Sequence, residues 1–391
     1  MKTYPVKQDI LLISPPFTQL NTPYPATAYI KGFLNTKGIA SDQMDLGIET
    51  ILALFSKSGL TALFEVAAGT IAQGDENSQR VYALRDSYIN TIEPVISFLQ
   101  DKDPTLAHFI CERNFLPEAS KFAEMEDVEW AFGSMGIRDQ ARHLATLYLE
   151  DISDLIIDVV DPHFGFSRYA ERLGMSAHSF DTLYHELQSP ASFISELMLS
   201  LLKKQIDKKA PNLVCLSVPF PGNLFAALTC GQWLKANHPQ IKVVMGGGYP
   251  NTELRSLSDP RVFEFVDFIS LDDGETPLMN LIDHLTGNRS AGMLKRTFTL
   301  IDGQVVYCND GLEPDVRQEK VGTPDYDGLP LKDYLSVIQL TNPMHRLWSD
   351  GRWNKLTMAH GCYWGKCTFC DISLDYIRNY EGSSAKLIVD R

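Results

Sequence analysis

Hydrophobic and polar residues follow two different patterns along the chain. Continuous apolar runs at residues 10–13, 213–218 and 241–245 are typical of strands buried on both faces of a sheet. The segments that follow them, such as 26–34 and 223–236, repeat apolar residues at helical spacing. Strands that alternate with helices predict an α/β fold with a doubly wound parallel sheet.

Between the second and third expected strands the pattern changes for about 150 residues, and only helical periodicity remains. In 151–161 apolar residues form one stripe and aspartates another, which we interpret as a solvated helix face. After His284 the residues 297–308 predict a hairpin turned at Asp302-Gly303, and 335–340 are apolar enough for a short strand. The predicted units are a sheet domain (1–50 and 206–290), a helical insertion (51–205), a hairpin and linker (291–350) and a last unit (351–391).

The composition excludes several classes of protein. The chain has 391 residues, 44% of them hydrophobic, which is enough for two or three packed cores. Its net charge of −14 argues against nonspecific binding to the phosphate backbone of nucleic acids. No apolar run is long enough to span a membrane. Residues 51–200 hold 10 Lys and Arg against 23 Asp and Glu, so the acidity belongs to the insertion. Residues 1–17 do not form a signal peptide, and we expect a cytoplasmic protein.

Three of the seven cysteines, Cys362, Cys367 and Cys370, fall within nine residues. Three thiolates on one loop can hold three irons of a [4Fe-4S] cluster and leave the fourth iron open to another ligand. Zinc is the alternative, with His360 or His345 as the fourth ligand. The spacing CxxxxCxxC also equals that of plant-type ferredoxins, but no fourth cysteine follows Cys370.

This segment resembles the radical S-adenosylmethionine superfamily, in which a three-cysteine loop follows the first strand of a partial β/α barrel. The resemblance also rests on Phe369, before the last cysteine, and on an expected strand at 355–359. The usual spacing of the superfamily is CxxxCxxC, so the first gap here is one residue longer. The resemblance implies Cys362, Cys367 and Cys370 as cluster ligands and Phe369 as a cofactor contact. It further implies reductive cleavage of S-adenosylmethionine to a 5′-deoxyadenosyl radical, with flavodoxin or ferredoxin as the reductant.

A doubly wound domain placed before such a loop resembles the cobalamin-binding class of these enzymes. The resemblance implies a cobalamin-binding-like Rossmann domain, with cobalamin at the carboxyl ends of the strands and its nucleotide tail in the sheet domain. Three glycines, 246–248, follow the expected strand at 241–245. Because glycine has no Cβ atom, they would let a bulky ligand approach the backbone, although a tight turn explains them equally well. The implied cobalamin contacts are Ser217, Gly246, Gly247, Gly248 and Tyr249.

Two further residues carry expectations of their own. Asp161-Pro162-His163-Phe164-Gly165 differs in spacing from the D-x-H-x-x-G loop that supplies a histidine to cobalt, and it lies in the insertion. We therefore expect His163 to sit in a loop that ends a helix, with its hydrogen bonds satisfied. Glu275 is expected to cap the helix that begins at Thr276, not to contact a ligand.

Only 21 residues follow Cys370, too few for the remaining strands of a barrel. We expect the chain to be the N-terminal portion of a radical S-adenosylmethionine enzyme, with 351–391 as the beginning of the barrel. A C-terminal fragment or a partner would complete the barrel. Two alternatives remain: a cobalamin-binding module whose cysteine loop is inactive, and a zinc-binding interaction protein.

Overall fold

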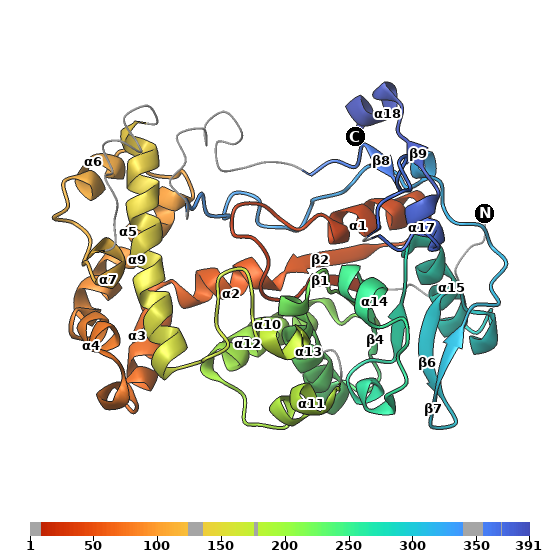
Figure 1. The fold of residues 1–391 in the computed structure, drawn as a ribbon, viewed down its shortest axis with the longest axis horizontal. Helices are drawn as coiled ribbons and strands as arrows, with labels where there is room; N and C mark the ends of the chain where they lie inside the picture. The colour runs from red at the N-terminus through yellow and green to blue at the C-terminus, as the bar shows by residue number, and fades with distance from the viewer. Residues whose placement is uncertain (1–8, 124–135, 176–178, 339–354, 369) are drawn as a thin grey trace.

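The computed structural model describes residues 9–123, 136–175, 179–338, 355–368 and 370–391. They build a seven-stranded sheet of order β2-β1-β3-β4-β5-β6-β7, with helices on both faces (Figure 1). The strands are β1 (Ile10–Ser14), β2 (Ser41–Asp45), β3 (Leu213–Ser217), β4 (Lys242–Gly246), β5 (Phe268–Ser270), β6 (Thr297–Ile301) and β7 (Gln304–Cys308).

The first five strands are parallel, and β6 and β7 are antiparallel. The predicted α/β fold with a five-stranded parallel sheet is therefore confirmed. The predicted hairpin is also present, but β6 pairs with β5, so the hairpin extends the main sheet and is not a separate unit.

Alternate residues of the buried strands pack into two cores on opposite faces. In β1, Ile10 and Leu12 pack against α1 and α15, whereas Leu11 and Ile13 face α2, α12 and α13. Among the described helices, α1 and α15 cover the first face, and a space remains between them above the central strands. The helices are α1 (Ala26–Thr36), α2 (Leu46–Leu54), α12 (Phe193–Lys209), α13 (Leu224–Asn237), α14 (Gly248–Glu253) and α15 (Glu275–Leu285).

The insertion contains helices and no strand among its described residues, as predicted. Most of it forms a lobe at one end of the sheet (Figure 1), while α10 (Glu171–Met175) and α11 (Asp181–Leu187) lie near α13. The lobe holds α3 (Lys57–Ala67), α4 (Glu76–Ala83), α5 (Arg85–Leu99), α6 (Leu106–Cys111), α7 (Ser120–Ala123) and α9 (Ile137–Val159).

The aspartate stripe of α9 is not uniformly solvated. Asp158 is exposed, but Asp151 is fully buried and accepts hydrogen bonds from the backbone N–H groups of Ala119 and Lys121. The prediction of a solvated face is thus wrong at Asp151, which orients α7 against α9, and also at Asp161, which is 1% exposed. In the described part of the chain no single helix could cross a membrane, and only α2 and α3, bent by 74°, reach the required length and apolarity together.

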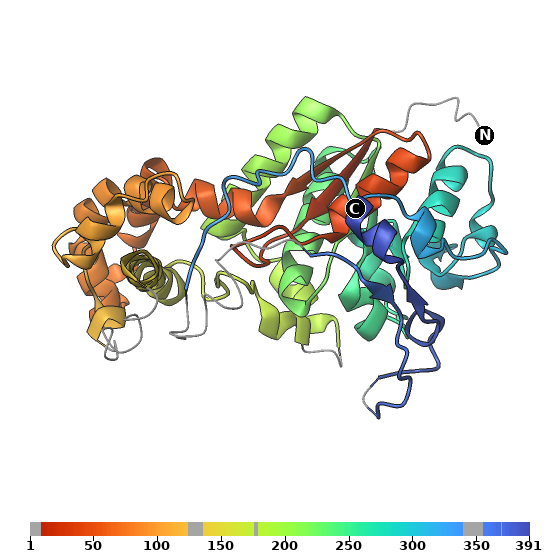
Figure 2. The same cartoon turned by 90° about the horizontal axis from the view of Figure 1, so that it is seen from above.

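Residues 318–338, which we call the strap, run from the sheet domain to the lobe (Figure 2). A Cβ atom on Gly32 of α1 would lie 2.0 Å from the carbonyl oxygen of Thr323, so this glycine permits the close contact. Further along, the N–H groups of Leu335 and Ser336 donate to carbonyls of Leu20 and Leu99. The strand predicted at 335–340 is wrong for 335–338, which is extended coil held by these bonds, and 339–340 lie outside the described residues.

The strap is anchored at a buried carboxylate. The Tyr334 hydroxyl donates to Asp45 Oδ2 over 2.7 Å, while Asp45 Oδ1 caps α2 by accepting from the N–H groups of Gly47 and Ile48. Glu49 lies one turn further along α2. Burial, together with the charge of Asp45, raises the pKa of Glu49 to about 7.

Replacement of Glu49 by glutamine should make the stability of the protein less sensitive to a rise of pH from 5 to 8. A raised pKa means that the folded state prefers protonated Glu49, so its contribution to stability is lost as pH rises from about 4.5 to about 7. We expect Glu49→Gln to gain about 1–2 kcal/mol in free energy of unfolding relative to the parent protein between pH 5 and pH 8. Urea unfolding at both pH values measures this gain. Glu65→Gln, at an exposed position of α3, is the control, and an equal gain there would contradict the prediction.

Candidate functional site

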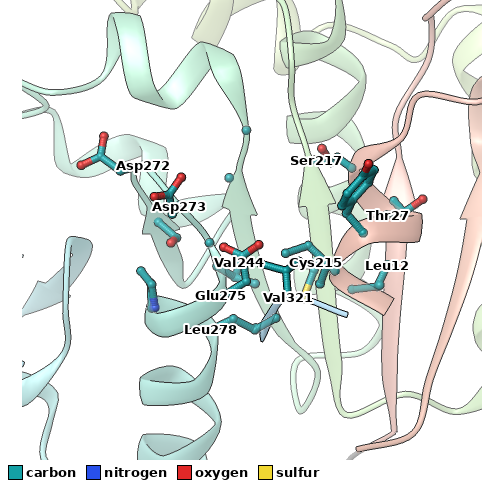
Figure 3. A pocket seen from close by; sticks show the side chains of 18 of the residues that line it. Leu12, Thr27, Cys215, Ser217, Val244, Asp272, Asp273, Glu275, Leu278 and Val321 are labelled. Carbon is teal, nitrogen blue, oxygen red and sulfur yellow. The ribbon is translucent and has the colours of Figure 1, made fainter. Parts of the chain in front are cut away.

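A cavity of about 380 Å³ lies at the carboxyl ends of β1, β3, β4 and β5, between α1 and α15 (Figure 3). Its floor is formed by Leu12, Cys215 and Val244, one from each of three neighbouring strands. Strands β1 and β3 are adjacent, and the helices that follow them lie on opposite faces of the sheet. Open α/β sheets bind ligands at such a point, because the two connections diverge there and leave a crevice.

The structure brings three of the predicted cobalamin contacts to this cavity and two elsewhere. Ser217, Gly246 and Gly247 line it. Gly248 does not line it, and a Cβ atom there would lie 2.6 Å from the carbonyl oxygen of Pro219. Tyr249 is 5% exposed, and its hydroxyl donates to the carbonyl of Gly174. Gly248 and Tyr249 therefore support the loop after β4.

Acidic residues surround one side of the cavity. Asp272 forms an ion pair with Arg255, and Asp273 Oδ1 accepts a hydrogen bond from His360 Nε2 over 2.7 Å. The prediction that Glu275 caps the following helix is wrong. The N-cap residue is Gly274, without a side-chain cap, and Glu275 is the first residue of the helix and lines the cavity.

Two hydroxyl groups of the site were not recognised from the sequence. Thr27 Oγ1 and Ser270 Oγ line the cavity and have no hydrogen-bond partner. A threonine in an amphipathic helix and a serine at a strand end are too common to identify alone. Only the convergence of α1 and β5 on one space distinguishes these two residues.

The cysteine loop is held by its own backbone contacts. It follows β8 (Ala359–His360), which pairs with β9 (Glu381–Gly382), so the strand expected at 355–359 is reduced to its last residue and His360. Gly361 adopts φ +69°, and a Cβ atom there would lie 2.2 Å from the carbonyl oxygen of Asn379. The N–H of Cys362 donates to the carbonyl of Ile377 over 2.8 Å. This fixes the start of the loop.

The three thiols have suitable chemistry for a cluster but are not gathered around one point. Cys362, Cys367 and Cys370 are free and partly exposed, and the N–H of Gly365 points to Cys362 Sγ at 3.4 Å. Across the described ranges, no three His, Cys, Asp or Glu side chains are placed to hold a metal ion. A cluster would therefore have to draw the loop closed, with metal binding providing the energy.

The structure describes one of the two histidines expected as a fourth zinc ligand. His360 is hydrogen-bonded to Asp273, and that hydrogen bond raises the pKa of His360. His345 and Phe369 lie outside the described residues.

The segment that carries the cysteine loop packs directly on the cavity. Thr357 and His360 form part of the cavity lining, and the N–H of Thr357 donates to the Tyr29 hydroxyl over 2.8 Å. After the cysteines, the ring of Tyr376 in α17 (Asp375–Arg378) lies 5.6 Å from the guanidinium of Arg255. The segments before and after the cysteines thus contact the part of the sheet domain that surrounds the cavity.

His163 lies away from this site. It follows α9 in a turn, its N–H donates to Asp161 Oδ1, and its Nε2 is 3.5 Å from Glu186 Oε1. The prediction of a loop that ends a helix is confirmed, and the ring of His163 faces Glu186. These residues line a separate cavity of about 430 Å³ beside α11, α12 and α13.

The site combines a largely apolar cavity, an acidic side and a loop with three thiols. The cavity has room for an organic ligand, and the three thiols are groups that bind metals in other proteins. No protein-family model, no curated protein and no solved structure matches this chain.

Proposed function

We propose that this chain carries the cofactor-binding parts of a radical S-adenosylmethionine-type enzyme. In this proposal the sheet domain binds cobalamin and the cysteine loop binds a [4Fe-4S] cluster. The observation that carries the proposal is the shared boundary of the two sites. Thr357 and His360, which lead into the cysteine loop, also line the cavity at the carboxyl ends of the strands.

The residues of the cavity suit the nucleotide tail of cobalamin. The tail would enter between α1 and α15 and lie on Leu12, Cys215 and Val244. Gly246 and Gly247 would allow the larger part of the ligand to approach the ends of the strands, because neither has a side chain. Among the described residues, no histidine lies in the loop directly after β1, so a cobalt ligand is not expected from that position.

The cysteine loop would hold the metal group at the mouth of this cavity. Cys362, Cys367 and Cys370 would bind three irons, and the fourth would remain available to S-adenosylmethionine. When bound, the cluster supplies the electron for cleavage of S-adenosylmethionine, and cobalamin can supply a methyl group. The partial exposure of the loop is compatible with delivery of that electron by flavodoxin or ferredoxin.

Anaerobic purification and cluster reconstitution test the iron part of the proposal. We expect about four iron and four sulfide ions per chain, as a [4Fe-4S] cluster requires. The electron paramagnetic resonance spectrum of the reduced protein should change when S-adenosylmethionine is added. Stoichiometric zinc without sulfide would instead support a zinc-binding interaction protein.

Titration with cobalamin tests the other part in the same preparation. We expect saturable binding and the absorption spectrum of cobalamin whose own base has left the cobalt. If the protein binds iron but not cobalamin, the cobalamin part of the proposal is wrong and only the radical S-adenosylmethionine part remains. Cobalamin binding without iron would favour a binding module.

A further inference from the structure

The cavity contains one carboxyl group for which the proposed function gives no role. Glu275 lies beside Val244 and Leu278 (Figure 3), and burial raises its pKa. Among the described residues no lysine or arginine lines the cavity, and His360, which does, is hydrogen-bonded to Asp273. The carboxylate accepts a hydrogen bond from its own backbone N–H, and a ligand that donates to it would give this buried group a second partner.

Two unpaired hydroxyl groups share the cavity with Glu275. Thr27, in α1, is 3% exposed, and its Oγ1 has no partner. Ser270 ends β5, and its Oγ is equally unpaired. A buried hydroxyl without a hydrogen bond costs about 1–3 kcal/mol. Three elements thus bring polar side chains to the wall of one cavity, which indicates a ligand with several hydrogen-bonding atoms.

The remaining surface of the cavity is apolar. Leu12, Cys215 and Val244 form the floor, while Ile30 and Leu281 come from the two helices. Burial raises the pKa of Cys215 to about 12, so its thiol is neutral and acts as a small apolar group. The occupant should therefore have a flat apolar body with polar atoms at its edge, as an aromatic heterocycle has.

We infer that the cavity binds an amine-bearing purine base and that Glu275, Thr27 and Ser270 recognise it. The amine of adenine can donate to the Glu275 carboxylate, and the ring nitrogens can accept from the two hydroxyls. The dimethylbenzimidazole of cobalamin offers one free ring nitrogen and two methyl groups, and it would leave polar groups of the cavity unpaired. The base could belong to the tail of a corrinoid, in which case the inference rests on the proposed function. A free nucleoside is the other source of the same base.

Dissociation constants for four ligands test the inference on the full chain. The ligands are cobalamin, the corrinoid with adenine in place of dimethylbenzimidazole, cobinamide, which lacks the tail, and adenosine. We expect the adenine corrinoid to bind about tenfold tighter than cobalamin, because it makes two more buried hydrogen bonds, one to Glu275 and one to the second hydroxyl. Glu275→Leu should reduce this difference to about threefold, whereas Glu275→Gln, which retains an acceptor oxygen, should keep most of it. Glu253→Gln, at an exposed position outside the cavity lining, is the control.

The outcomes separate this inference from the proposed function. Equal affinity for the two tailed corrinoids, or cobinamide as tight as either, would overturn the inference and leave cobalamin binding intact. Adenosine binding that Glu275→Leu weakens, with no corrinoid bound, would support base recognition and overturn the cobalamin part of the proposed function. No binding by any of the four ligands would overturn both. Urea unfolding of each variant confirms that a lost affinity is not a lost fold.

Discussion

Replacement of any one of Cys362, Cys367 and Cys370 by alanine is expected to remove the [4Fe-4S] cluster. A cubane held by three protein thiolates loses a whole iron site with each substitution, and the loop has no further cysteine to replace it. Iron and sulfide should fall from about four per chain to near zero after anaerobic reconstitution. The brown colour and the paramagnetic signal of the reduced protein should disappear together.

Cys111→Ala is the matched control for these substitutions. Cys111 is partly exposed like the loop cysteines, but it lies at the end of α6 in the lobe. Its replacement should leave the iron content unchanged. The loop variants should also unfold at the same urea concentration as the metal-free parent, because the loop thiols are outside the buried core. Retention of iron by all three single variants would contradict the assignment of these ligands.

The architecture of the sheet could be predicted because its signals are local. A parallel strand covered on both faces needs apolar residues throughout, and 10–13, 213–218 and 241–245 have them. The helical insertion was recognisable for a similar reason, since each of its helices needs one apolar stripe. These patterns remain readable regardless of what lies next to each element in space.

The strap was not predictable in the same way. Its residues make no regular pattern, and their structure depends on distant partners, such as Asp45 for Tyr334 and Gly32 for Thr323. A buried segment of coil needs partners for its backbone groups, and here the loop after β1 and the last residue of α5 supply them to Leu335 and Ser336. The apolar residues of the strap therefore resembled a strand although no strand forms there.

The residues of the candidate site also differ in whether their role can be predicted from local sequence. The three cysteines form a motif within nine residues and could be identified from spacing alone. The role of Glu275 could not, because an acidic residue at the start of a helix is typical of capping. Its position in a cavity follows from the gap between α1 and α15, which depends on how many helices cover that face of the sheet.

Two glycines at the end of β4 have different expected roles: the fold requires Gly247, and the ligand requires Gly246. Gly247 adopts φ +112°, and a Cβ atom there would lie 2.7 Å from the carbonyl oxygen of Val218. Gly247→Ala should therefore lower the free energy of unfolding by roughly 3 kcal/mol, since only glycine tolerates this backbone conformation. A Cβ atom on Gly246 meets nothing closer than 3.6 Å, the carbonyl oxygen of Ser270. Gly246→Ala should leave the midpoint of urea unfolding unchanged.

Ligand binding should depend on Gly246, although the stability of the fold does not. Gly246 lines the cavity on the same side of β4 as Val244, so an added methyl group would occupy space that the corrinoid needs. We expect Gly246→Ala to weaken corrinoid binding about tenfold, and Gly246→Val to weaken it further, with both variants folded. Equilibrium dialysis against the corrinoid measures the effect. If both variants bind like the parent protein, the glycines after β4 serve the turn alone, and the ligand does not reach the end of this strand.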